Sequence, residues 1–184
     1  MAGVRRGARV ALRILALTGS LRAASSNSAI LRIAARLAPV GWQVEVYPGL
    51  DDLPFFNPDL DRAFDDPALP HAVRALRATI VDSDALLISS PEYAHGVSGM
   101  MKNALDWLVG GPEMVAKRVA LLNTAPHATH AMAALGETLR TMSVAMCDEA
   151  CVAIPVPRNR SDDELLADDS IVVPLRAALA VLCR

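Results

Sequence analysis

Residues 12–27 read LRILALTGSLRAASSN, an apolar segment that gives way abruptly to small and polar residues. The first part, LRILALT (residues 12–18), is typical of a buried strand. The second part, GSLRAASSN (residues 19–27), holds more serine, arginine and asparagine than a turn requires. We therefore predict a strand that ends in a loop built to hold a ligand.

The segments that follow alternate between strand and helix patterns. Residues 85–90, ALLISS, form a short continuous run typical of a central parallel strand covered on both faces. Ser161 followed by Glu164 predicts a capping box at the start of the last helix. The expected strands are 10–18, 42–47, 85–90, 118–124 and 150–156, and the expected helices are 27–38, 71–83, 98–111, 129–143 and 161–183, the last broken near Pro174.

This alternation implies a parallel sheet, because each right-handed crossover between parallel strands needs a helix. Five strands with helices on both faces suit the flavodoxin-like doubly wound α/β fold, with strand order 2-1-3-4-5. The sequence contains neither an internal repeat nor a linker, so we expect residues 1–184 to form a single flavodoxin-like domain. We expect residues 1–8 to be disordered.

Composition argues against several kinds of partner. The formal net charge is −2 and aromatic residues make up 4% of the chain, so we expect neither nucleic acid nor a membrane as partner. No apolar run approaches the length of a membrane span. The N-terminal arginines imitate a signal peptide, but Arg13 interrupts the apolar segment, and we expect a cytoplasmic protein.

The cysteines are Cys147, Cys151 and Cys183, a set too sparse for a disulfide framework. A metal site is conceivable, because two of them lie four residues apart, downstream of His127 and His130. We favour small, partly buried thiols and expect no metal, because no paired C-x-x-C supports zinc.

In an open doubly wound sheet, ligands bind beyond the carboxyl ends of the strands, at the switch point. This rule selects three loops, 18–27, 90–98 and 123–130. The first loop precedes a helix whose unpaired backbone amides, together with Arg22 and several hydroxyls, suit an anion.

The first loop lacks the G-x-G-x-x-G of dinucleotide sites and the G-K-[ST] of P-loops. A single phosphate therefore fits better than a triphosphate. The alternative is that Ser25 or Ser26 merely caps the helix and Arg22 is solvated.

The second loop places Glu92, Tyr93 and His95 at the predicted crevice, and Gly96 permits close backbone approach. The alternative is an ordinary surface loop. Residues 48–70 carry five prolines, and a loop of this length is expected to be functional or mobile.

The motifs GSLRAASSN (residues 19–27) and PEYAHGVSGMMKNALDW (residues 91–107) resemble those of the NADPH-dependent FMN reductase family. This is a family of flavodoxin-like flavoproteins related to quinone, azo-dye and chromate reductases. The resemblance covers nearly the whole chain, and two motifs in register are more specific than either alone.

Carried over residue by residue, the resemblance implies FMN as the bound cofactor. The residues implied at its phosphate are Ser20, Arg22, Ser25 and Asn27. Those implied around the isoalloxazine, largely through backbone groups, are Pro91, Glu92, Tyr93, His95, Gly96 and Thr124. The helix residues Lys102, Asn103, Asp106 and Trp107 are implied to be structural or to lie at a dimer face.

Several features depart from the family pattern, among them Met101 in place of leucine. Ser98 stands where the family often has proline, which predicts lower loop rigidity. Ala94 stands where some relatives carry asparagine. The loop after the fourth strand lacks the serine- and glycine-rich form of relatives, which favours looser FMN binding.

The resemblance implies an oxidoreductase that takes a hydride from NADPH or NADH and passes electrons through FMN to a small acceptor. Candidate acceptors are free flavin, a quinone, an azo compound or a metal oxyanion. Because the flavin carries the chemistry, we assign no catalytic side chain, and His95, His127 and His130 receive no catalytic role.

Two alternatives remain open. The chain could be a flavin-binding redox sensor or interaction protein with little turnover. A serine hydrolase ranks lower, because the G-x-S-x-G elbow is absent. The family resemblance also implies a homodimer or homotetramer.

Overall fold

The computed structural model describes residues 11–61 and 66–184, so the disorder predicted for residues 1–8 lies outside the described residues. The strands are β1 (Leu12–Thr18), β2 (Trp42–Val46), β3 (Ala85–Ser89), β4 (Glu92–Tyr93), β5 (Gly96–Val97), β6 (Arg118–Asn123), β7 (Ala145–Met146) and β8 (Val152–Ala153). The helices are α1 (Ser26–Arg36), α2 (His71–Asp82), α3 (Gly99–Leu108), α4 (Thr129–Thr141), α5 (Asp162–Leu166) and α6 (Asp169–Leu182). Short 3₁₀ turns are η1 (Pro58–Leu60), η2 (Pro112–Met114) and η3 (Asp148–Ala150).

The central sheet is parallel and has the order β2-β1-β3-β6-β7, with β8 also paired to β6. This is the predicted order 2-1-3-4-5, with an edge strand in two pieces and a separate hairpin formed by β4 and β5. The predicted α/β fold is therefore confirmed.

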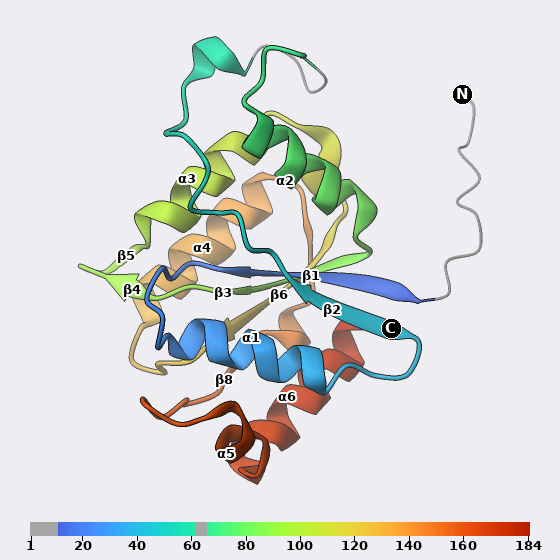
Figure 1. The fold of residues 1–184 in the computed structure, drawn as a ribbon, viewed down its shortest axis with the longest axis vertical. Helices are drawn as coiled ribbons and strands as arrows, with labels where there is room; N and C mark the ends of the chain where they lie inside the picture. Colours follow the sequence, from blue (N-terminus) through green and yellow to red (C-terminus); the bar gives the residue numbers. More distant parts are fainter. Residues whose placement is uncertain (1–10, 62–65) are drawn as a thin grey trace.

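Side chains of β1 alternate between the two faces of the sheet. Ile14 and Ala16 pack with α1 and α6, whereas Leu15 and Leu17 pack with α2, α3 and α4. In Figure 1, α1, α5 and α6 accordingly lie below the sheet, and α2, α3 and α4 lie above it. Burial of apolar side chains on both faces stabilises the sheet by about 25 cal/mol per Å² removed from water.

The edge strand differs from the predicted strand at 150–156. β7 pairs with the start of β6 and β8 pairs with its end, because η3 interrupts the strand between them. Cys147 and Cys151 flank this turn and pack against opposite core clusters, so the two thiols serve different faces of the sheet. Among the residues that the structure describes, no three histidine, cysteine or acidic side chains group in a way that could hold a metal ion.

The break in the last helical region lies before α6, and not near Pro174 as predicted. Asp168 caps α6 by accepting a hydrogen bond from the Ser170 backbone N–H at 3.1 Å. Pro174 lies inside α6, whose buried apolar face holds the helix together across the missing hydrogen bond. The capping box at Ser161 and Glu164 is confirmed.

Helix α3 anchors the proline-rich loop that leads to η1. Trp107 is fully buried and its Nε1 donates to the Pro54 carbonyl at 2.8 Å. Asn103 accepts from the Phe56 N–H through Oδ1 at 2.8 Å and donates to the same Pro54 carbonyl at 3.0 Å. These contacts agree with the structural role implied for Asn103 and Trp107.

A buried ionic cluster joins this loop to α2 and η2. Arg77 is only 2% exposed. Its guanidinium lies 2.8 Å from an Asp61 carboxylate oxygen and 3.3 Å from Glu113 Oε1, and it donates to the Trp107 carbonyl at the end of α3. The sequence did not reveal this cluster, since an arginine on an amphipathic helix is usually exposed.

Glu113 makes stability depend on pH. Burial raises the pKa of its carboxyl above the usual 4.5, although Arg77 opposes the shift. The folded chain therefore holds this proton more tightly than the unfolded chain, so the added stability is complete below pH 4.5 and is lost as pH rises through the raised pKa.

Glu113→Gln removes this titration. Its free energy of unfolding should therefore rise relative to that of the wild type as pH increases above 4.5, measured by urea denaturation at a series of pH values. A difference between the two chains that stays constant with pH would contradict the assignment.

Candidate functional site

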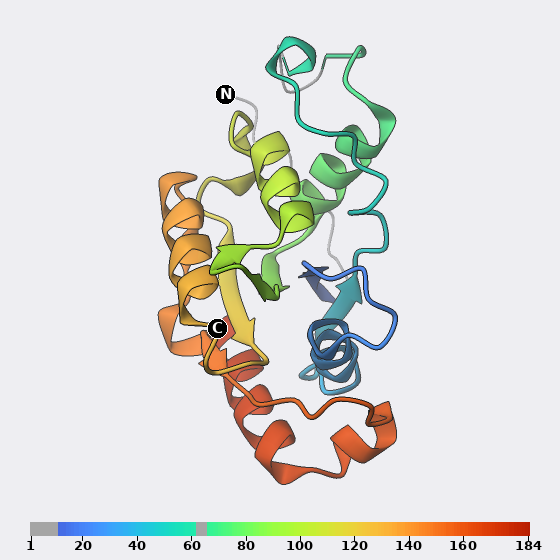
Figure 2. The ribbon, with the colours of Figure 1, turned by 90° about the vertical axis from the view of Figure 1, so that its left-hand side faces the viewer.

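A cleft of about 600 Å³ opens at the carboxyl ends of β1, β3 and β6. Figure 2 turns the left-hand side of Figure 1 toward the viewer and looks onto this end of the sheet. The cleft is lined by Ser20, Arg22, Ala24, Ser25, Ser26, Asn27, Ser90, Pro91, Glu92, Tyr93, Asn123, Thr124, Ala125, Pro126, His127, Ala128, Pro155, Val156, Pro157 and Arg158. Eight of the ten residues predicted for the site are in this lining, and His95 and Gly96 are not.

The loop after β1 is pressed against the end of β3. The Gly19 N–H donates to the Ser89 carbonyl at 2.8 Å. A Cβ atom on Gly19 would lie 2.2 Å from Ser90 Oγ and 2.7 Å from Ser90 Cβ. Only glycine fits there, and its lack of a side chain sets the course of the loop that carries Ser20 and Arg22.

The start of α1 combines capping with a polar junction between strands. Ser25 Oγ accepts from the Ser28 N–H at 3.2 Å, which confirms that Ser25 caps the helix. Its hydroxyl hydrogen can still serve a ligand, because a hydroxyl both donates and accepts. Asn27 Oδ1 accepts from Ser89 Oγ at 2.8 Å and from Thr124 Oγ1 at 3.2 Å, so one amide joins the start of α1 to the ends of β3 and β6.

The charges around the cleft favour an anion at the start of α1. This helix has no acidic residue in its first turn, so its polarised amides are not neutralised. Arg22 and Arg158 line the cleft and are exposed, and no ion pair of either is found among residues 11–61 and 66–184.

Glu92 is the only carboxylate among the described residues of the lining, and it is already engaged. Its Oε2 accepts from the Ala131 N–H at 2.8 Å, in the first turn of α4. Glu92 thus caps α4, whose own N-cap residue Ala128 makes no side-chain cap. The amides at the start of α1 remain available to a ligand.

Ser98 replaces the proline of the family pattern and is held in place by its hydroxyl. It is 3% exposed, accepts from the Met101 N–H at 3.3 Å as the N-cap of α3, and lies 3.2 Å from Ser90 Oγ. These hydrogen bonds restrain the end of the hairpin, which a proline at position 98 would restrain in the family pattern.

The loop 90–98, predicted without strands, contains the antiparallel hairpin of β4 and β5. Its two-residue turn is Ala94 and His95, with φ of 49° and 60°, values that a hairpin turn of type I′ requires at both positions. The His95 ring stacks on His130 of α4 with centroids 4.3 Å apart, outside the lining of the cleft. A contact of His95 or Gly96 with flavin stays a prediction.

Ala94→Gly should raise the free energy of unfolding by about 0.5–1 kcal/mol, because a positive φ is costly for alanine and not for glycine. Ala94→Val, which adds a branched side chain at the same φ, should lower it. Thermal unfolding of the three chains measures both effects. A glycine variant less stable than the wild type would contradict a strained turn.

The site residues that sequence reasoning missed come after β8. Pro155, Pro157 and Arg158 line the cleft together with Pro126. The rule that ligands bind beyond the carboxyl ends of strands applies to the edge strand as well, and following it there could have found them. The prolines form a stiff apolar wall, and Tyr93, 60% exposed, adds an aromatic surface.

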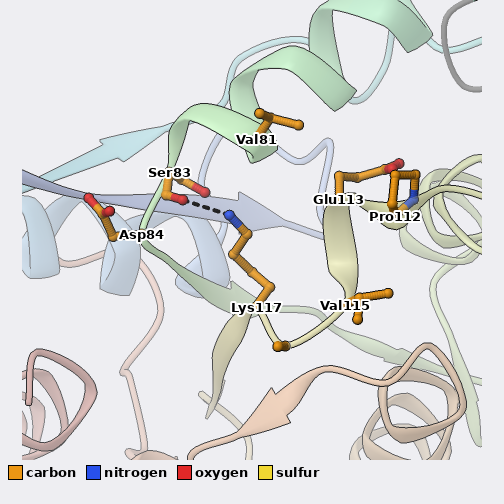
Figure 3. Close-up of a pocket in the computed structure, with 8 residues that line it drawn as sticks. Val81, Ser83, Asp84, Pro112, Glu113, Val115 and Lys117 are labelled. Atoms are coloured by element: carbon orange, nitrogen blue, oxygen red, sulfur yellow. Dashed lines mark hydrogen bonds between the residues drawn. The ribbon is translucent and has the colours of Figure 1, made fainter. Parts of the chain in front are cut away.

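A second hollow of about 370 Å³ lies at the opposite end of the sheet, near the starts of β3 and β6 (Figure 3). The lysine in its lining, Lys117, already makes structural hydrogen bonds. Lys117 Nζ donates to the Ser83 carbonyl at 2.6 Å and to the Ile80 carbonyl at 2.8 Å, which caps the end of α2. We therefore place the functional site at the first cleft.

The residues present fit the phosphate and ring of a flavin mononucleotide. Backbone amides, hydroxyls and guanidinium groups gather at the start of α1, which suits a single phosphate. Tyr93 and the prolines offer flat, apolar surfaces of the kind that a ring system contacts. The fold and cleft together define a flavodoxin-like protein whose cleft lies at the switch point, where folds of this kind bind ligands.

Comparison with known proteins identifies the family. Residues 12–156 match the family model described as NADPH-dependent FMN reductase, and the chain belongs to this family. The predicted resemblance is thereby confirmed. FMN and NAD(P)H are the flavin and the electron donor of this family.

Individual relatives agree with this assignment. The chain is 38% identical over 117 residues to the NADPH:quinone oxidoreductase of Arabidopsis thaliana, covering 61% of this chain and 58% of that protein. It is 33% identical over 114 residues to the quinone reductase of Escherichia coli (strain K12), covering 61% and 59%. The matched part is therefore less than two thirds of the length of these curated relatives.

Among solved structures, the chain resembles FerB, a flavoenzyme NAD(P)H:(acceptor) oxidoreductase from Paracoccus denitrificans. The TM-score is 0.70 with 26% sequence identity, covering 93% of this chain and 97% of that chain. Within the part of the chain that the structure describes, none of the helices has the length and apolar character to cross a membrane.

Proposed function

We propose that this chain binds FMN in the cleft at the carboxyl ends of β1, β3 and β6 and catalyses electron transfer from NAD(P)H to a quinone or another small acceptor. The observation that carries the proposal is the start of α1, where free amides, hydroxyls and Arg22 face one cleft without a competing carboxylate. Family membership and the names of the quinone reductase relatives support the reaction class.

The eight predicted site residues that line the cleft each have a task in this proposal. Ser20, Arg22 and Ser25 hold the phosphate by hydrogen bonds and charge. Asn27 acts mainly by joining the strand ends, since its Oδ1 already accepts from Ser89 and Thr124. Thr124 positions Asn27 in turn.

The loop after β3 contacts and positions the flavin ring. Pro91 and Tyr93 exclude water from one side, and Glu92 fixes the hairpin to α4 through its bond to Ala131. When bound, FMN supplies a ring that accepts a hydride from NAD(P)H and returns electrons to an acceptor. The protein contributes orientation and exclusion of water, and no general acid or base is required of it.

The proposal is tested by flavin binding, followed by quenching of flavin fluorescence. FMN should bind at least about 100-fold more tightly than riboflavin, because only FMN has the phosphate, whose charge-assisted hydrogen bonds are each worth about 1.5–3 kcal/mol. Equal affinity for the two flavins would contradict a phosphate site at α1.

The redox-sensor alternative predicts the same binding and a different kinetic result. A sensor binds FMN but consumes little NAD(P)H when a quinone is added, whereas an enzyme consumes both substrates continuously. The free-flavin, azo and metal-oxyanion acceptors are compared with quinone in the same assay.

We also propose a homodimer or homotetramer, supported by the exposed aromatic surface of the loop before η1. Phe55 in this loop is 92% exposed, next to Phe56, which packs edge-to-face on Trp107. Sedimentation or light scattering decides between an oligomer and a monomer. The cytoplasmic location stays a prediction.

A further inference from the structure

We propose that Arg158 is a second cationic group at the FMN phosphate, supplied by the turn after β8. This inference rests on the proposed function and extends it to a residue outside the predicted site. Arg158 lies two positions beyond the segment that matches the family model, residues 12–156, and it lines the same cleft as Arg22.

Two contacts place the segment before Arg158 at the start of α1. Ser26 Oγ donates to the Val156 carbonyl at 3.2 Å, and the Val156 N–H donates to the Thr124 carbonyl at 3.2 Å. Val156 thus lies between the first residue of α1 and the residue after β6. In Figure 1 the segment between β8 and α5 passes just below the start of α1.

The turn that carries Arg158 is braced on both sides. Pro155 and Pro157 fix φ before it. Asn159 follows with a φ of 60°, a conformation that asparagine tolerates better than most residues. Arg160 then pairs with Asp168 at 2.7 Å, which ties the turn to the start of α6. A backbone restrained in this way lowers the entropy lost when Arg158 binds an anion.

Three of the acidic groups that follow Arg158 are engaged elsewhere. Asp162 pairs with Arg32 at 2.7 Å and Asp163 with Arg36 at 2.7 Å, while Asp168 pairs with Arg160. The pKa values of Asp162 and Asp168 are lowered by hydrogen bonds, first from Arg32 and Ser170 respectively, so both remain ionised and paired near neutral pH. Within the described ranges, no such acid holds Arg158, whose guanidinium is free to meet a ligand in the cleft.

The two cationic side chains of the cleft suit a phosphate monoester. Arg22 and Arg158 bring two positive charges, and the carboxylate of Glu92 is bound to the amide of Ala131. A flavin phosphate carries close to two negative charges at neutral pH. One guanidinium from the loop after β1 and one from the turn after β8 would balance it.

The test compares FMN and riboflavin binding in Arg158→Gln, Arg158→Lys and Arg176→Gln. Arg176 is exposed on α6 and outside the cleft, so its variant removes the same charge without touching the site. Arg158→Gln should weaken FMN about tenfold and leave riboflavin unchanged. Arg158→Lys should recover part of the loss, and Arg176→Gln should match the wild type.

Three results would overturn the inference while leaving the proposed function intact. The first is wild-type FMN affinity in Arg158→Gln. The second is an equal loss for FMN and riboflavin, which would mean that Arg158 supports the ring or the loop. The third is unchanged FMN binding with a raised KM for NADPH but not for NADH, which would assign Arg158 to the dinucleotide phosphate. Failure of the wild-type chain to bind FMN would instead overturn the proposed function and this inference together.

Discussion

Replacing Arg77 by methionine should lower the free energy of unfolding by about 3–5 kcal/mol, the usual cost of removing one partner from a buried ionic cluster. Arg77 is 2% exposed, and its guanidinium lies within 2.8 Å of Asp61 and 3.3 Å of Glu113. The Trp107 carbonyl at the end of α3 would also lose its donor. The variant leaves two buried carboxylates without their cation, and it releases the loop that precedes α2.

A double variant separates charge from packing. Arg77→Met combined with Glu113→Gln should lose less stability than Arg77→Met alone, because one of the two uncompensated charges is gone. Urea denaturation of the wild type, both single variants and the double variant closes the cycle. A loss of less than about 1 kcal/mol in Arg77→Met, the range of exposed pairs, would show that the cluster is not desolvated as described.

Gly19→Ala should lower both stability and FMN affinity. The new Cβ would lie 2.2 Å from Ser90 Oγ and 2.7 Å from Ser90 Cβ, so either the loop after β1 or the end of β3 must move. Overpacking of this kind costs about 1–3 kcal/mol. FMN affinity should fall about tenfold or more, because displacing the loop weakens the bonds from Ser20 and Arg22 to the phosphate.

Two further variants test this cause. Gly99→Ala is the matched control, since a Cβ on Gly99 meets no atom within 4 Å, and this variant should behave like the wild type. Adding Ser90→Gly to Gly19→Ala removes the two nearest atoms and should restore part of the affinity. Flavin titration and thermal unfolding follow both effects. Full FMN affinity in Gly19→Ala would mean that the course of this loop does not set the phosphate site.

The long elements could be predicted from the sequence because their local patterns agree with their burial. β3 reads as an apolar run and is buried at every residue. In β1, alternate residues of the segment 14–17 face the two sides of the sheet, so all four are apolar and buried. Ser25 and Ser161 cap their helices, as serine before an apolar run suggests.

Features that depend on tertiary contacts were missed or misplaced. The hairpin of β4 and β5 has a turn of alanine and histidine, which carries none of the usual asparagine or glycine signal. Pro174 suggested a helix break, but the break is set by Asp168, while packing of α6 on the sheet overrides the proline. Arg77 lies on the buried face of α2, at helical spacing from Val73 and Ile80, but an arginine is usually exposed. Its burial depends on Asp61 and Glu113, which meet it from distant segments.

In the candidate site too, some residues could be predicted from the sequence and others could not. Loops that directly follow long strands, with Ser20, Arg22, Asn27 and Pro91, could be assigned to one cleft from strand order alone. Arg158 was missed, because the rule was applied to the loops after the first, third and fourth strands and not to the edge strand, which is split in the fold.

The most direct test of the central claim measures NAD(P)H oxidation by the purified chain with a quinone acceptor, while FMN is titrated from none to saturation. We expect a rate that depends on quinone and rises with FMN to a plateau, at the same FMN concentration that saturates binding. Riboflavin at that concentration should support far less turnover. If excess FMN neither binds the chain nor supports NAD(P)H oxidation, the account is contradicted.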